Sequence, residues 1–268
     1  MYFDSHAHLT EDCFAQDFDS IVENMKEASV TGMMEIGFDL SSSEKAVRLA
    51  ERFSWVHAAV GSHPDDAAQV DEARIAVYRE LCKNPRVKAI GEIGLDYYWP
   101  ENPPRDFQQQ VFRAQLELAL ELDLPVIIHD REAHGDSLRI VCDYPGLRGV
   151  FHCFSGSVEM ARELLRRGWY LGFDGPITYK NAVKALDVIA ACPTDRMLLE
   201  TDSPYLAPVP NRGKRNDSRN LPYIAARIAE IKSMTTEEVA EEHPAWIQLF
   251  QTHLTVICFE VIHIREVA

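Results

Sequence analysis

The sequence predicts an α/β protein built as a single (β/α)8 TIM barrel, and three observations support this fold class. Eight short apolar segments that resemble strands recur at intervals of roughly 30 residues, close to the repeat of such a barrel. Amphipathic helical patterns fill the gaps between them. The 268 residues suffice for one barrel-sized domain or two smaller ones.

The eight expected strands are mostly continuous apolar runs, as expected for strands buried on both faces of a parallel sheet. They cover residues 2–9, 32–38, 56–63, 87–96, 125–130, 148–154, 169–175 and 196–202. Strands that alternate with helices through short connections form right-handed βαβ units. A count of eight favours a closed barrel over an open doubly wound sheet.

The spacing of apolar residues predicts the helices. Positions three and four apart are apolar over residues 18–28 and again over 107–122, the longest candidate. Ser157 is a typical helix N-cap, and Gly168 is a typical stop. No Gly-x-Gly-x-x-Gly motif follows the first strand, which argues against a dinucleotide-binding sheet.

We find no linker or low-complexity tract, so we expect one domain over residues 1–268, with an atypical, apolar C-terminal segment at 240–268. No apolar run approaches the ~20 residues of a membrane span, and no signal peptide is visible at the N-terminus. The six cysteines are scattered without a C-x-x-C pair, which fits reduced thiols. We therefore predict a cytoplasmic protein with no membrane association and no obligate protein partner.

The net charge of −15 argues against a broad surface that coats nucleic acid. It leaves open a nucleic-acid enzyme with a small basic site. Part of the negative charge is also consistent with carboxylates that hold divalent cations.

The first expected strand contains an acid and two histidines at alternate positions. Side chains two residues apart on a strand point to the same face, so Asp4, His6 and His8 project together. Neutral imidazoles in this arrangement can share one cation. This pattern alone is weak, because two histidines near a terminus also occur by chance.

Other polar residues end the later strands, and in a barrel all these ends meet at the face where active sites lie. Buried charges cost several kcal/mol unless they are paired or coordinated, so this convergence favours divalent metal ions. The set suffices for two ions that share a bridging carboxylate, which we expect to be Glu92; salt bridges and helix caps are the alternatives. The predicted ligands are His6, His8, Glu92, His129, His152 and Asp202, with Glu92 and Asp202 also catalytic.

Neighbouring residues allow more than one interpretation. Asp4 is expected to orient a histidine rather than bind metal. His63, in "GSHP", either contacts substrate or caps a loop. The aromatic residues 97–99 either stack nucleobases or pack ordinarily. Cys153 is expected to be a small core residue.

A basic loop, "PNRGKRNDSRN" at residues 210–220, follows the last expected strand. It carries Arg212, Lys214, Arg215 and Arg219 against the single acid Asp217. Beside a metal site, such a loop suggests an anionic substrate, most naturally a phosphate. We predict Arg212, Lys214 and Arg215 as substrate contacts; the alternative is a solvated basic loop.

The motifs "FDSHAHL", "GSHP", "GEIGLDYY", "PVIIHDR", "FHCFSG" and "LLETDSPYLAPVPNRGKRN" together resemble the TatD family of metal-dependent deoxyribonucleases, within the amidohydrolase-like barrels. The resemblance runs to about residue 240. It implies that His6, His8 and Asp202 hold one ion, that His129 and His152 hold another, and that Glu92 bridges them. Family members are described as magnesium-dependent nucleases that often trim DNA from 3′ to 5′.

We therefore expect hydrolysis of phosphodiester bonds in DNA, either single-stranded or at 3′ ends, by water that two divalent ions activate. Magnesium is the expected ion, although such sites also accept manganese, zinc or nickel. One alternative is a metal-dependent amidohydrolase or deacylase on the same barrel. Another is a non-catalytic barrel that binds a partner through its C-terminal extension.

The C-terminus departs from the family pattern. Ala245 occupies the position where the family's closing helix has an asparagine, and Pro244 interrupts the pattern. Residues 251–268 do not align with the family. These departures put the closing helix in doubt.

Overall fold

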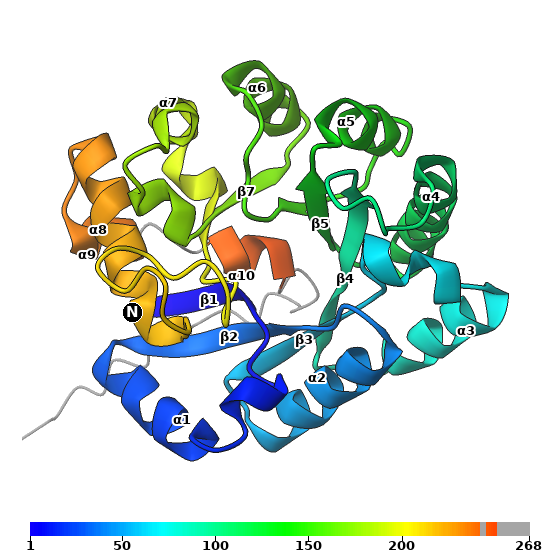
Figure 1. The fold of residues 1–268 in the computed structure, drawn as a ribbon, viewed down its shortest axis with the longest axis horizontal. Helices are drawn as coiled ribbons and strands as arrows, with labels where there is room; N and C mark the ends of the chain where they lie inside the picture. The colour runs from blue at the N-terminus through cyan, green and yellow to red at the C-terminus, as the bar shows by residue number, and fades with distance from the viewer. Residues whose placement is uncertain (242–244, 251–268) are drawn as a thin grey trace, which may run out of the picture.

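The computed structural model describes residues 1–241 and 245–250. Its sheet has eight strands in the order β1 to β8, and each strand pairs in parallel with the next (Figure 1). The strands are β1 (Tyr2–Ala7), β2 (Val30–Ile36), β3 (Val56–Val60), β4 (Val87–Asp96), β5 (Val126–Arg131), β6 (Gly149–Phe151), β7 (Tyr170–Phe173) and β8 (Met197–Leu199).

The segment that follows β8 closes the barrel against β1. The backbone N–H of His8 donates to the carbonyl of Ser203, and the N–H of Asp202 donates to the carbonyl of His6, both at 2.9 Å. A parallel bridge joins Ala7 to Ser203. This closure confirms the predicted (β/α)8 barrel.

Eight helices separate the strands or follow the last one, and they surround the barrel in Figure 1. They are α1 (Phe18–Glu27), α2 (Leu40–Arg52), α3 (Glu72–Leu81), α4 (Arg105–Glu121), α5 (His134–Cys142), α6 (Val158–Arg166), α7 (Val183–Ala191) and α8 (Leu221–Lys232). Ser157 caps α6 as predicted, because its hydroxyl accepts the N–H of Met160 at 3.2 Å. No helix in residues 1–241 and 245–250 is long and apolar enough to cross a membrane.

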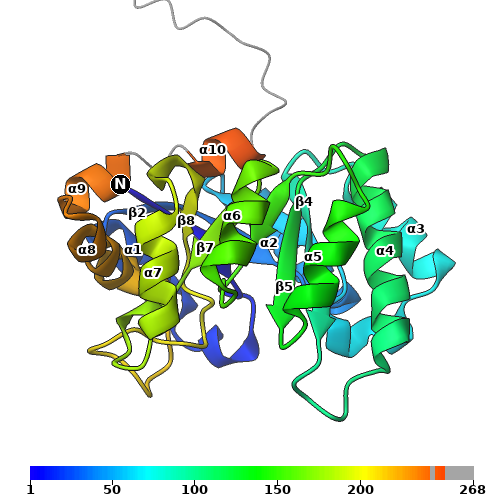
Figure 2. The ribbon, with the colours of Figure 1, turned by 90° about the horizontal axis from the view of Figure 1, so that it is seen from above.

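Two short helices follow, α9 (Thr236–Glu241) and α10 (Ala245–Phe250). Figure 2 places α10 at the end of the barrel opposite the long loops that follow β4 and β8. Trp246 stacks on Phe3 of β1 with 4.1 Å between ring centroids, and Ala245 and Leu249 are buried against the inside of the barrel.

The doubt about the closing helix was therefore misplaced. The helix begins at Ala245, so its sequence contains no proline. The small side chain of Ala245 fits the buried position. Residues 251–268 lie outside the described part, so the roles suggested for this extension and the single-domain boundary at 268 stay predictions.

Candidate metal centre

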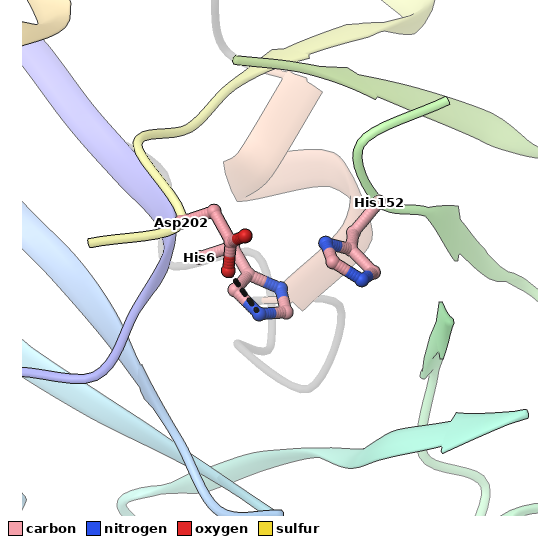
Figure 3. A group of neighbouring side chains, drawn as sticks. All are labelled: His6, His152 and Asp202. Carbon is pink, nitrogen blue, oxygen red and sulfur yellow. Dashed lines mark ion pairs between the residues drawn. The ribbon is translucent and has the colours of Figure 1, made fainter. Parts of the chain in front are cut away.

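The six predicted ligands converge at the carboxyl end of the barrel, although they span almost 200 positions of sequence. Figure 3 shows three of them, His6, His152 and Asp202, with their side chains directed into one space. The imidazoles of His6 and His152 stack at 4.0 Å between centroids. By element, His6 lies on β1, Glu92 on β4 and His129 on β5, whereas His8, His152 and Asp202 follow β1, β6 and β8.

Four of these side chains form a first group of donor atoms. His6 Nε2 lies 3.3 Å from His8 Nε2, 3.4 Å from Glu92 Oε2 and 3.6 Å from Asp202 Oδ1. Ligands that bind an ion at about 2.0–2.2 Å are separated from each other by roughly 3.0–3.6 Å. The first group therefore has the spacing of a ligand set around one cation.

Glu92 also contributes to a second group through its other oxygen. Glu92 Oε1 lies 2.8 Å from His129 Nδ1 and 2.7 Å from His152 Nε2, and these two nitrogens are 3.3 Å apart. The carboxylate thus directs one oxygen to each group. A carboxylate that bridges two ions has this arrangement.

Neighbouring groups fix the orientation of two of the imidazoles. His8 Nδ1 lies 3.1 Å from the carbonyl oxygen of Ile36, so this nitrogen carries a proton and the other ring nitrogen, Nε2, faces Glu92 and Asp202. His129 Nε2 lies 3.2 Å from Asp96 Oδ2, a carboxylate contact typical of metal-binding histidines. Imidazole nitrogens and carboxylates that face one another in a buried space fit a divalent cation, which would displace any proton on these nitrogens.

The electrostatics agree with this fit. Burial raises the pKa of Glu92, but the charges of His152 and His6 and hydrogen bonds from His129 and His152 outweigh burial and hold the pKa well below its ordinary value. Burial lowers the pKa of His129, but hydrogen bonds to Asp96 and Glu92 raise it to about 10. A cation that binds His129 Nδ1 would therefore have to displace a proton.

Sequence reasoning missed one buried acid behind the centre, Glu200. Its Oε1 accepts the backbone N–H of Cys153 and lies 3.9 Å from His152 Nδ1. Gly172 on the neighbouring strand makes room for it, because a Cβ at Gly172 would lie 2.3 Å from Glu200 Oε2. The available signal was the glycine inside an apolar strand, which often marks a close approach.

Asp4 has a different role from the one expected. Its carboxylate accepts the backbone N–H of Thr201 at 2.9 Å and the hydroxyl of Thr201 at 2.6 Å, and it accepts no hydrogen bond from an imidazole within the described residues. The Asp4 carboxylate thus contacts His6 only through the backbone N–H, which it accepts at 3.4 Å, and does not orient the ring directly. Asp4 instead holds the segment that leads to Asp202.

A cavity of about 210 Å³ opens above the two donor groups. His63 lines this cavity. Its Nδ1 lies 2.7 Å from Asp65 Oδ1, and its ring centroid lies 4.2 Å from that of His129. A substrate contact by His63 stays a prediction. The complete lining is His8, Glu11, Phe38, His63, Asp65, Glu92, His129, His152, Asp202 and Tyr205.

The cations of the basic loop divide into two kinds. Arg215 forms an ion pair with Asp17, which directly precedes α1, and Arg219 forms an ion pair with Asp217 at 2.7 Å. Arg212 instead lies over the ring of Tyr179 at 4.3 Å, and Lys214 Nζ is 3.4 Å from Asn211 Oδ1. Neither has a carboxylate partner among residues 1–241 and 245–250.

A family model described as "TatD related DNase" matches residues 3–248. The chain belongs to the TatD family. An uncharacterized metal-dependent hydrolase, YabD of Bacillus subtilis, is 43% identical to this TatD-family chain over 90% of it and 94% of the relative. A 3′-5′ ssDNA/RNA exonuclease, TatD of Cronobacter sakazakii, is 35% identical over 92% of this chain and 93% of the relative.

Solved structures agree with the fold. The crystal structure of YJJV, a TatD homologue from Escherichia coli K12, superposes with a TM-score of 0.87 at 29% identity and covers 93% of this chain and 98% of its own. A TatD-family hydrolase from Entamoeba histolytica superposes at 0.83 with 23% identity, which supports the fold alone. The chain is a metal-dependent hydrolase of the TatD family.

Proposed function

We propose that this TatD-family chain hydrolyses phosphodiester bonds in DNA with two divalent cations. The observation that carries the proposal is the carboxylate of Glu92, whose two oxygens face two separate sets of imidazole nitrogens. In this proposal one ion is held by His6, His8 and Asp202, the other by His129 and His152, and both by Glu92.

Magnesium is the proposed native ion, and the mixed nitrogen and oxygen donors also suit manganese, zinc or nickel. Bound there, divalent ions lower the pKa of a water molecule and neutralise charge on the phosphate. Asp202 is the proposed acceptor of the proton from that water, because its side chain is 14% exposed at the cavity whereas that of Glu92 is 5% exposed.

The carboxylate of Asp202 is ionised, as a proton acceptor must be. Burial raises its pKa, but a hydrogen bond with His8 and the charges of His6, His152 and His8 lower it below the ordinary value. On the substrate side, Arg212 and Lys214 are the proposed contacts to a flanking phosphate, because no carboxylate within the described residues neutralises them. Arg215 would have to leave Asp17 to join them.

The relatives named as 3′-5′ ssDNA/RNA exonucleases support a single strand or a 3′ end as the substrate. A cytoplasmic location stays a prediction.

The test compares end-labelled single-stranded DNA, RNA and a panel of carboxamides, each with and without magnesium or manganese. We expect metal-dependent shortening of DNA, lost in Glu92→Gln and retained in Glu72→Gln, a matched change on the exposed surface of α3. Cleavage of carboxamides alone would support the amidohydrolase alternative and contradict the proposal.

A further inference from the structure

Two exposed aromatic side chains and an arginine form a cluster outside the central cavity, which we call the aromatic corner. Tyr98 and Trp99, in the loop between β4 and α4, are 51% and 46% exposed. Their ring centroids are 4.8 Å apart and their planes meet at 89°. Arg131, at the end of β5, places its guanidinium carbon 4.1 Å from the centroid of Tyr98 and 5.3 Å from that of Trp99.

A single buried carboxylate ties the aromatic corner to the metal centre. Asp96 Oδ1 accepts the backbone N–H groups of Tyr98 at 2.9 Å and Trp99 at 3.4 Å, while Asp96 Oδ2 lies 3.2 Å from His129 Nε2. Arg131 follows His129 by two residues on β5. The corner is therefore held in a defined position beside the donor groups. Figure 2 shows its loop projecting past the strand ends on the same side as the loop after β8.

The aromatic and cationic side chains of the corner are suited to binding a nucleic-acid strand. Among residues 1–241 and 245–250, no ion pair neutralises Arg131, although the whole chain carries a net charge of −15. The adjacent Tyr97, in contrast, is used internally, because its hydroxyl donates to Asp136 Oδ2 at 3.0 Å. Exposed aromatic side chains next to a cation without an ion-pair partner are typical of sites that stack bases and attract phosphates.

We propose that the aromatic corner stacks one nucleobase of a single-stranded DNA whose neighbouring phosphodiester lies in the central cavity. The two rings are perpendicular, so only one of them can lie parallel to a given base. This inference rests on the proposed nuclease function and assigns a binding site to it. A small neutral carboxamide would need neither the rings nor the guanidinium.

The experiment measures equilibrium binding of two labelled single strands of equal length, one with bases and one with an abasic backbone, in the presence of EDTA. We expect the wild type to prefer the strand with bases by about tenfold, the effect of one stacked base. Tyr98→Ala/Trp99→Ala should lose this preference, and Trp99→Phe, which retains a ring, should keep most of it. Tyr223→Ala, an equally exposed aromatic on α8, is the matched control and should bind as the wild type does.

The outcomes separate this inference from the proposed function. A double variant that keeps its preference for bases, or a wild type that shows none, overturns the corner as a base site even if DNA is cleaved. An equal loss on both strands also overturns it, because only charge or fold would then have changed. If the wild type cleaves neither DNA nor RNA with magnesium, the nuclease proposal fails, and the binding ratio still decides the role of the corner.

Discussion

Glu92 Oε1 lies 2.8 Å from Nδ1 of His129 on the neighbouring strand, while Glu92 Oε2 lies 3.4 Å from Nε2 of His6. One buried carboxylate thus joins two groups of imidazoles, one from β1 and the other from β5 and the end of β6. The chemistry proposed for this TatD-family chain depends on that relationship.

The first prediction concerns Glu92. Glu92→Gln removes the charge that holds both groups, so we expect manganese affinity to fall by at least about 100-fold, the upper range for the loss of a mere supporting contact. Titration calorimetry measures both affinity and stoichiometry. An unchanged stoichiometry with unchanged affinity would exclude the bridging role.

The second prediction concerns Asp96, which contacts His129 Nε2 at 3.2 Å. Asp96→Asn keeps an oxygen for the N–H groups of Tyr98 and Trp99 but weakens the support of His129. We expect affinity for one of the two ions to fall by about 10–100-fold while the other is retained. Asp143→Asn, in an exposed pair with Arg113, is the control and should leave both affinities intact.

The third prediction compares two glycines. A Cβ at Gly172 would lie 2.3 Å from Glu200 Oε2, so Gly172→Ala should reduce the free energy of unfolding by about 1–3 kcal/mol. A Cβ at Gly135 meets nothing within 4 Å in α5, so Gly135→Ala should instead increase it by about 0.4–1 kcal/mol. Urea denaturation measures both. Equal effects would mean that Glu200 does not need the space at Gly172.

The fourth prediction concerns the basic loop. Arg212→Ala/Lys214→Ala removes two cations without a described carboxylate partner, so DNA affinity should fall. The slope of log K against the logarithm of the salt concentration should become less negative by about 0.7 for each phosphate contact that is lost. Lys83→Ala, in an exposed pair with Glu80, serves as the control. A salt dependence identical to that of the wild type would show that the loop does not contact the substrate backbone.

Much of the fold is predictable from the sequence, because buried parallel strands are continuous apolar runs. The expected strand 87–96 matches β4, but several other expected strands extend past the observed ones. The segment 148–154 was expected where β6 spans Gly149–Phe151, and 196–202 where β8 spans Met197–Leu199. His152 and Asp202 fall in these extra residues. Both still donate a backbone N–H to the neighbouring strand, to Ile128 and His6, but positive φ angles at Cys153 and Asp202 end the regular strand there.

Contacts between side chains far apart in sequence are less predictable. The spacing of Asp4 and His6 on one strand suggested that the Asp4 carboxylate orients an imidazole, yet both of its oxygens accept hydrogen bonds from Thr201, 197 residues away. The role of Glu200 likewise depends on a space at Gly172 on another strand. Such partners are set by how the barrel closes; a local pattern such as the glycine in β7 can signal a close approach but does not identify the partner.

The most direct test of the central claim is anomalous diffraction from crystals of the full chain soaked in manganese. The account predicts two manganese peaks, one on each side of the Glu92 carboxylate, the first beside His6 and His8 and the second beside His129 and His152. A single peak, or peaks that do not contact Glu92, would contradict it.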